Sequence, residues 1–159
     1  MYYTKFKIDI CTIILVGDEK GLITLYMETE NNTNKFQIDK EWIYNDNFFK
    51  DIKNEIYEYF QGDRKKFTVK LNLKGTEFQK KVWCELQNIP YGEVRTYKDI
   101  AIKIGNPKGA RAIGMANNKN PIPLIIPCHR VIGSNGNLTG FAFGINIKEK
   151  LINLEKLGE

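Results

Sequence analysis

The alternation of apolar and polar positions predicts a small sheet at the start of the chain. Residues 11–16 form an apolar, β-branched run, and residues 22–28 alternate apolar and polar side chains, both of which are typical of strands. Residues 17–21 between them begin and end with glycine and predict a hairpin loop. Residues 31–34 form a polar loop.

A helix and a further extended segment complete the first part of the chain. Over residues 47–61 the apolar side chains recur every three or four positions, which is the spacing of one helix face, and Gly62 is placed to end the helix. Residues 67–73 alternate again and predict a strand or an extended linker. The apolar face of the helix comprises Phe48, Phe49, Ile52, Ile56, Tyr59 and Phe60.

The rest of the chain is mostly helical in pattern. Thr76 and Gln79 have the spacing of a capping box at the start of a helix that Pro90 ends. Asn146 and Glu149 have the same spacing and predict the cap of a last helix that reaches about residue 157. The apolar stripe of the first of these helices comprises Phe78, Val82, Trp83 and Leu86.

Two short helices between these form a candidate helix-turn-helix unit. Thr96 is placed to cap a helix over residues 97–104, and the sequence Gly-Asn-Pro at 105–107 breaks it. A second helix is expected over residues 109–118, with a small apolar face. Helix, tight turn and basic second helix is the pattern of many DNA-binding units. The small apolar face comprises Ala110, Ile113 and Met115.

The charge is distributed unevenly and divides the chain near residue 70. Of the net charge of +5, residues 1–70 contribute −1 (11 Lys and Arg, 12 Asp and Glu) and residues 71–159 contribute +6 (13 against 7). Between Asp99 and Glu149 the sequence contains no acidic residue but six basic ones, which suits a polyanion or, equally, a solvated basic face. We therefore expect an α+β protein with two domains, 1–70 and 71–159.

Several classes of protein do not fit this composition. The chain has 42% hydrophobic and 27% charged residues, without an apolar run long enough to span a membrane and without a signal-peptide pattern. Three cysteines without a CxxC pair argue against a disulfide framework and for a reducing, cytoplasmic location. With only one histidine, the sequence offers no usual zinc ligand set. We expect no metal, no cofactor and no membrane partner, and a monomer.

Cys128 is the strongest candidate for a reactive residue. It follows an apolar run, 121–126, and Pro127; the three prolines of this segment predict a rigid, extended support. Cys11 lies in an apolar strand and Cys84 beside Trp83 on a helix, so both are expected in the core. A buried structural cysteine is the alternative for Cys128 as well.

A thiol needs a base to become a strong nucleophile, and His129 is the one histidine available. Neighbouring residues of an extended chain point apart, so a bridging water is expected between Cys128 and His129. Glu155, near the apolar face of the last helix, is a candidate to orient His129. The alternatives are a structural histidine and a carboxylate paired with Lys148 or Lys156.

The ordered motifs of residues 75–155 resemble the O6-alkylguanine-DNA alkyltransferases. The sequence Pro-Cys-His-Arg at 127–130 is the most specific of them, whereas residues 1–70 carry no motif of their own. The motifs are TEFQ at 76–79, VW at 82–83, IPYGE at 89–93, TY at 96–97, IA at 100–101, GNP at 105–107, RAIG at 111–114, NP at 120–121, IPCHRVI at 126–132, Gly140 and KLINLE at 150–155.

The resemblance implies a ribonuclease-H-like N-terminal domain and a C-terminal domain with a winged-helix-like unit that binds double-stranded DNA containing O6-alkylguanine. Cys128 would accept the alkyl group once, irreversibly, with His129 taking its proton through water and Glu155 orienting His129. Asn120 would fix the turn that presents Cys128, and Tyr97 would protonate the leaving guanine.

The resemblance also implies how DNA and the alkyl group are held. Arg111 would enter the base stack and hold the gap left by the flipped nucleotide. The small residues Ala110, Ala112 and Gly114 would let the second helix of the unit lie in the minor groove. Val131, Ala142 and Phe143 would line the alkyl pocket.

One loop departs from the family pattern. Residues 140–144 read Gly-Phe-Ala-Phe-Gly, so Phe141 lacks a tyrosine hydroxyl and Phe143 replaces a glycine. We expect Phe143 to narrow the pocket and to favour methyl over benzyl adducts.

Two other functions remain open on the sequence. Cys128 and His129 also suit a hydrolase that forms an acyl-enzyme, although nothing in the sequence marks an oxyanion hole. A DNA-binding or regulatory protein without catalysis is the second alternative, and the presence of the cysteine argues against it.

Overall fold

The computed structural model describes residues 1–30, 36–138 and 141–158. The chain divides into two compact units, Met1–Leu73 and Lys74–Glu159. The first combines a small sheet with a helix and the second is mainly helical, so the α+β class expected from the sequence is confirmed. The polar loop expected at residues 31–34 lies outside the described residues.

The first unit is built on a four-stranded sheet with the order β3-β2-β1-β4. Strand β1 pairs antiparallel with β2, β2 pairs antiparallel with β3, and β4 pairs parallel with β1. The pairing of Asp18 with Gly21 leaves only two residues in the hairpin loop, so the loop is shorter than expected. The strands are β1 Tyr2–Lys7, β2 Thr12–Asp18, β3 Gly21–Glu28 and β4 Ile43–Tyr44.

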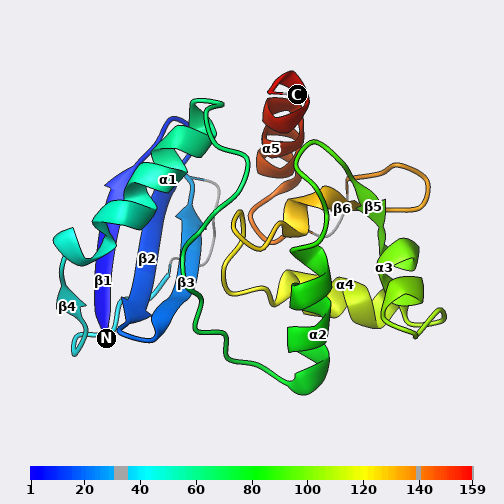
Figure 1. The fold of residues 1–159 in the computed structure, drawn as a ribbon, viewed down its shortest axis with the longest axis horizontal. Coiled ribbons are helices and arrows are strands. Elements are labelled where there is room, and N and C mark those ends of the chain that lie inside the picture. Colours follow the sequence, from blue (N-terminus) through cyan, green and yellow to red (C-terminus); the bar gives the residue numbers. More distant parts are fainter. Residues whose placement is uncertain (31–35, 139–140, 159) are drawn as a thin grey trace. The chain divides into compact units, whose positions relative to one another are not determined.

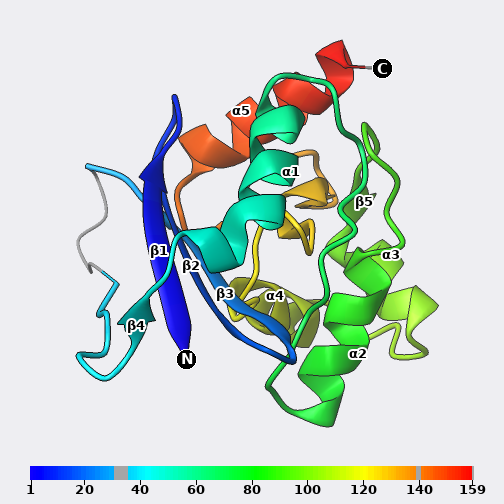
Figure 2. The same cartoon turned by 60° about the vertical axis from the view of Figure 1, so that its left-hand side comes forward.

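A helix covers this sheet. A 3-10 turn, η1 (Asn47–Phe49), leads into α1 (Lys50–Phe60), which lies across one face of the strands in Figures 1 and 2. Phe49, Ile52, Ile56 and Tyr59 are buried. Phe48 is exposed, so its place in the expected apolar face is wrong; of the two phenylalanines in the 3-10 turn, Phe49 is the buried one.

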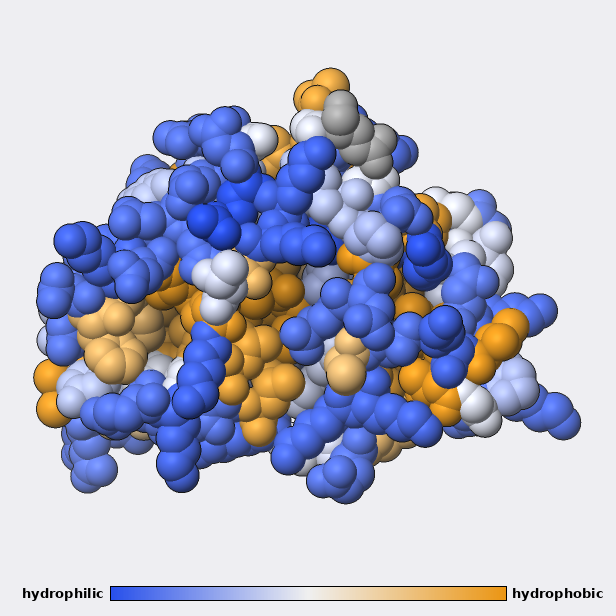
Figure 3. All heavy atoms as spheres, viewed as in Figure 1, coloured by the Kyte–Doolittle hydropathy of each residue, from blue (hydrophilic) through white to orange (hydrophobic). Residues whose placement is uncertain are grey.

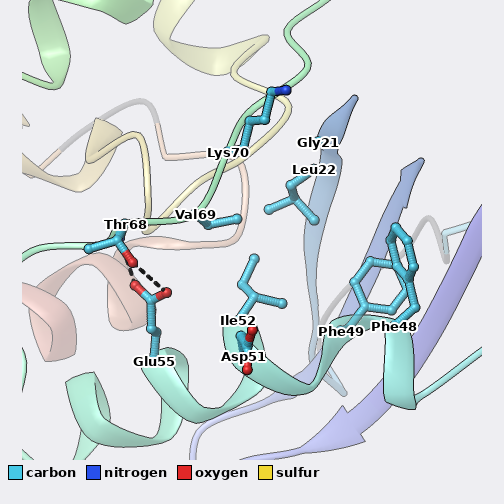
Figure 4. Close-up of a pocket in the computed structure, with 10 residues that line it drawn as sticks. All are labelled: Gly21, Leu22, Phe48, Phe49, Asp51, Ile52, Glu55, Thr68, Val69 and Lys70. Carbon is cyan, nitrogen blue, oxygen red and sulfur yellow. Dashed lines mark hydrogen bonds between the residues drawn. The ribbon is translucent and has the colours of Figure 1, made fainter. Parts of the chain in front are cut away.

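The segment after α1 is extended and pairs with the start of β3. Leu22 N donates to Lys70 O and Asn72 N donates to Leu22 O, each at a distance of 2.8 Å. Glu55 holds the segment to α1, accepting bonds from Thr68 N (2.7 Å) and Thr68 Oγ1 (3.0 Å) (Figure 4). A cavity of about 320 Å³ lies between α1 and this segment, with Leu22, Ile52 and Val69 in its wall.

The second unit begins with two capped helices. Thr76 accepts from Gln79 N and caps α2 (Glu77–Leu86), as the capping-box spacing predicts. Thr96 caps α3 (Tyr97–Lys103) in the same way, with Asp99 as its partner. Val82, Trp83 and Leu86 are buried, whereas Phe78 is exposed because it lies in the first turn of α2.

The remaining elements follow with some differences from expectation. Helix α4 (Ala110–Asn118) packs against α2 and α3, and it exposes Met115 instead of burying it. Helix α5 (Ile145–Leu157) starts at Gly144, whose φ is 102°, so the cap expected at Asn146 is wrong. The other elements are β5 (Arg95–Thr96), the 3-10 turn η2 (Cys128–Arg130) and β6 (Val131–Ile132), which pairs parallel with β5.

The visible surface is mostly hydrophilic, with hydrophobic side chains gathered in a few patches (Figure 3). Within the described residues, no helix has the length and apolar character needed to cross a membrane. Cys11 is buried, as expected, but Cys84 is exposed on α2. The expectation of a core position for Cys84 is therefore wrong.

Candidate active site

The candidate site is built on the turn that precedes Cys128. The Asn120 side chain clamps this turn, donating from Nδ2 to Ile126 O (2.8 Å) and accepting at Oδ1 from Ile122 N (2.9 Å). Leu124 adopts a φ of 77°, the one positive value at a non-glycine position in the described chain. The segment is therefore tightly turned and not extended, because the Asn120 clamp closes it between its prolines.

Cys128 opens the turn η2 and is almost fully buried, with 4% of its surface exposed. Its backbone N–H donates to Ile126 O at a distance of 2.7 Å. Burial raises the pKa of the Cys128 thiol to about 11, against lowering contributions from the Asn120 side chain and the Lys148 charge. The resting thiol is thus protonated at neutral pH, and a reaction requires a base or a positive charge to stabilise its thiolate.

His129 forms a buried pair with Glu155 on α5. His129 Nε2 lies 2.7 Å from Glu155 Oε2. Burial lowers the pKa of His129, so its imidazole is neutral at pH 7 even though Glu155 partly opposes this. Because the Glu155 carboxylate accepts a hydrogen bond from Nε2, the neutral ring carries its proton on Nε2. Nδ1 therefore keeps a lone pair. Nδ1 has no hydrogen-bond partner within the part of the chain that the structure describes.

Arg130 completes this pair and was not singled out from the sequence. It donates from Nε to Glu155 Oε1 (2.8 Å), from Nη2 to Oε2 (3.0 Å) and from Nη1 to Ile89 O (2.7 Å). Burial alone raises the pKa of Glu155, but the bonds and charges of His129 and Arg130 outweigh it and lower that pKa to about 2. The expectation that Glu155 orients His129 agrees with this geometry.

Lys148 and Tyr97 lie close to each other, and both interact electrostatically with Cys128. Lys148, fully buried on α5, donates from Nζ to Val131 O and lies 5.8 Å from the centre of the Tyr97 ring. Burial, with a contribution from Cys128, raises the pKa of Tyr97. Lys148 is seven residues before Glu155, two helical turns on the same face, and this spacing was the signal in the sequence that could have placed it at the site.

Helix α4 links the site to an exposed surface. Asn117 Nδ2 donates to Cys128 O (3.4 Å), and a Cβ placed on Gly114 would lie 3.9 Å from the Tyr97 ring. Arg111 is exposed, and Ala110 and Ala112 are half-buried. Gly114 thus lies against the Tyr97 ring, three residues after Arg111 on the same helix.

The expected alkyl pocket is described only in part. Val131 is buried, Ala142 is exposed, and Phe143 is half-buried with its ring 5.7 Å from that of Phe141. Gly140 lies outside the described residues. Across residues 1–30, 36–138 and 141–158, no group of three or more His, Cys, Asp or Glu could hold a metal ion.

Cys128 is buried and is followed in the chain by a histidine that is bonded to a carboxylate, an arrangement suited to a protein that uses a thiol nucleophile. Two family models match the chain: the 6-O-methylguanine DNA methyltransferase ribonuclease-like domain over residues 1–73, and the DNA binding domain of the same family over residues 77–157. The chain belongs to the 6-O-methylguanine DNA methyltransferase family, and the resemblance based on its motifs is confirmed.

Individual relatives agree with this membership. The chain is 52% identical to a methylated-DNA–protein-cysteine methyltransferase of Methanosarcina acetivorans over 98% of both chains. It is 40% identical to the constitutive enzyme of that name from Bacillus subtilis, over 98% of this chain and 96% of the relative. The crystal structure of Mycobacterium tuberculosis OGT in complex with DNA has a TM-score of 0.90 at 41% identity, covering 99% of this chain and 94% of that one.

Proposed function

We propose that this protein repairs double-stranded DNA by transferring the alkyl group of O6-alkylguanine to Cys128, once per molecule. The buried Cys128–His129–Glu155 arrangement carries the proposal, because it supplies a thiol, a base and an orienting carboxylate within one enclosed site. Both DNA binding and transfer are assigned to residues 71–159. The three free cysteines suit a reducing compartment, so the proposed location is the cytoplasm, and the proposed working form is a monomer.

The proposed reaction moves one alkyl group and balances its protons. The Cys128 thiol proton passes through a water molecule to Nδ1 of His129, and the thiolate attacks the alkyl carbon. The bond between that carbon and O6 breaks, its electron pair remains on guanine, and guanine takes a proton from the Tyr97 hydroxyl. Solvent then returns the proton from His129 to Tyr97. The product is a thioether, which water does not cleave under mild conditions.

Mass spectrometry tests this function directly. After incubation with an excess of duplex oligonucleotide carrying O6-methylguanine, we expect the protein to gain one methyl group, on Cys128. Cys11 is buried and its pKa is raised to about 12 by burial, so it should stay unmodified. Cys84, although exposed, lies outside the site. More than one methyl group lost from DNA per protein molecule would contradict a single-turnover reaction.

Arg111 provides a second test, aimed at the role of α4. If the exposed Arg111 holds the gap left by a flipped base, Arg111→Ala should slow transfer from duplex DNA roughly tenfold, a loss of about 1.4 kcal/mol. Transfer from free O6-methylguanine base should not change, because no base has to leave a stack. Arg111→Lys, which keeps the charge, separates insertion from attraction to phosphate. An equal loss with the free base would disprove this role.

A further inference from the structure

Lys148 is a buried cation that the proposed proton transfers do not use. Its side chain is fully buried on α5, although lysine is almost never buried without a reason. Its Nζ donates to the carbonyl of Val131, three residues beyond Cys128, and lies over the ring of Tyr97. These two contacts fix the ammonium between the end of η2 and the start of α3.

This position places a positive charge next to the nucleophile. Lys148 and Cys128 interact electrostatically, each favouring the charged form of the other. Burial removes water that would otherwise screen the pair, so the attraction is stronger than at a surface. Glu155, the buried carboxylate of the site, is bonded to His129 and Arg130.

We propose that the Lys148 ammonium is the counter-ion that stabilises the Cys128 thiolate as it forms. The proposal deepens the proposed function and rests on it: His129 removes the thiol proton, and Lys148 makes the resulting anion less costly in a site without bulk water. Lys148 is a positioning residue in this scheme, since it exchanges no proton with the substrate and acts through its charge on Sγ.

The proposal requires a specific pH dependence of thiol reactivity. Burial lowers the pKa of Lys148 to about 8, below the value of about 11 for Cys128. Below pH 8 the fraction of molecules that combine a Cys128 thiolate with a charged Lys148 increases tenfold per pH unit. Above pH 8 one proton is shared between the two groups, so the fraction with thiolate and ammonium no longer rises. A plateau is therefore expected from about pH 8. It ends about one pH unit higher if Lys148 changes thiolate stability tenfold, because thiolate beside uncharged Lys148 then dominates the rate.

The other charged groups around the pair do not produce this plateau. On η2, burial lowers the pKa of His129 from 6.5, so it titrates below the plateau, and the Arg130 guanidinium is paired with Glu155. On α3, the pKa of Tyr97 is raised from 10.0 by burial and by Cys128, so it remains neutral where the plateau begins. Glu155 on α5, with its pKa near 2, is ionised over the whole range.

Iodoacetamide is the probe that tests the pair without DNA. The alkylation rate of Cys128 is measured by mass spectrometry from pH 6 to 10, and Cys84 on the same molecule serves as an exposed reference thiol. At pH 7 we expect Lys148→Met to slow the alkylation of Cys128 about tenfold, because the variant removes a charge that favours its thiolate. The plateau should disappear in this variant. Lys148→Arg should keep the rate at pH 7 but lose the plateau, because arginine does not give up its proton in this range. The exposed control Lys150→Met should keep both.

The outcomes distinguish this proposal from the proposed function. An unchanged rate and a retained plateau in Lys148→Met would overturn the counter-ion role. If that variant does not fold, the wild-type protein is used. NMR with labelled lysine measures the titration of Lys148, which should occur at the pH where the plateau begins. A Lys148 side chain that is uncharged at pH 7 would also overturn it. Failure of wild-type protein to take methyl from DNA, with the plateau present, would count against the proposed function alone.

Discussion

Replacing Cys128 with serine is expected to abolish methyl transfer and to leave binding to methylguanine DNA intact. Serine has nearly the shape of cysteine, so the Asn120 clamp and the bond from Asn117 to the carbonyl of residue 128 should persist. A hydroxyl, however, ionises far less readily than a thiol, and the buried site makes the anion costlier still. Transfer is measured as methyl lost from a duplex oligonucleotide, and binding as fluorescence anisotropy of the same duplex.

Cys84→Ser and Cys11→Ser are the matched controls and should retain transfer. Transfer by the Cys128→Ser protein would show that another residue accepts the methyl group. The alternatives left open by the sequence, which family membership does not favour, also give different results. A hydrolase would release product from a reporter ester repeatedly, and a purely regulatory DNA-binding protein would behave identically with and without the thiol.

Removing the Glu155 carboxylate is expected to cause the second large effect, on both stability and transfer. Glu155→Leu leaves the Arg130 guanidinium buried without its carboxylate, which costs about 3–5 kcal/mol. His129 also loses its orienting acceptor, so transfer by the folded fraction should fall. The free energy of unfolding is measured by urea titration, and transfer in single-turnover experiments.

The double variant Glu155→Leu with Arg130→Met separates the two effects. Replacing both charges with apolar side chains removes the unpaired buried cation and should recover much of the lost stability. Transfer should remain slow, because His129 still lacks its acceptor. Full recovery of transfer together with stability would show that Glu155 acts only on the fold.

Acid titration gives an independent measure of the same carboxylate. Its folded-state pKa of about 2 lies below the unfolded value near 4.5, so its stabilisation is complete above pH 4.5. That stabilisation is lost as the pH falls from 4.5 towards 2, because the unfolded chain binds the proton first. The wild-type protein should therefore lose stability over this window, and Glu155→Leu should lose less.

Local signals in the sequence predicted local structure well. The capping box at Thr76 and the helix cap at Thr96 were confirmed, because each depends on residues only three positions apart. The same reasoning failed at Asn146: Gly144 has a positive φ, a backbone conformation that glycine adopts without strain, and it caps α5 two residues earlier than expected. Strand β1 was not predicted, because its polar residues interrupt the apolar pattern and its pairing with β2 is needed to define it.

Long-range contacts at the site were predictable only through the family. The family resemblance predicted that Glu155 orients His129. Helix periodicity alone favoured Glu155 as an ordinary surface carboxylate. The turn at Leu124 could not be predicted from its prolines, because the Asn120 clamp depends on contacts with residues two and six positions away. Lys148 was read as part of a basic stretch, since charge alone does not reveal burial.

The burial of Cys128 also determines how long an unreacted molecule remains usable. A protein that reacts once is a stoichiometric reagent, so the repair capacity of a cell equals the number of molecules whose thiol is still intact. A thiol that is 4% exposed, with its pKa raised to about 11, reacts slowly with small oxidants and electrophiles in solution. The number of molecules with an intact thiol then depends on protein synthesis, protein turnover and the number of lesions repaired. Side reactions of the thiol with other small molecules contribute little.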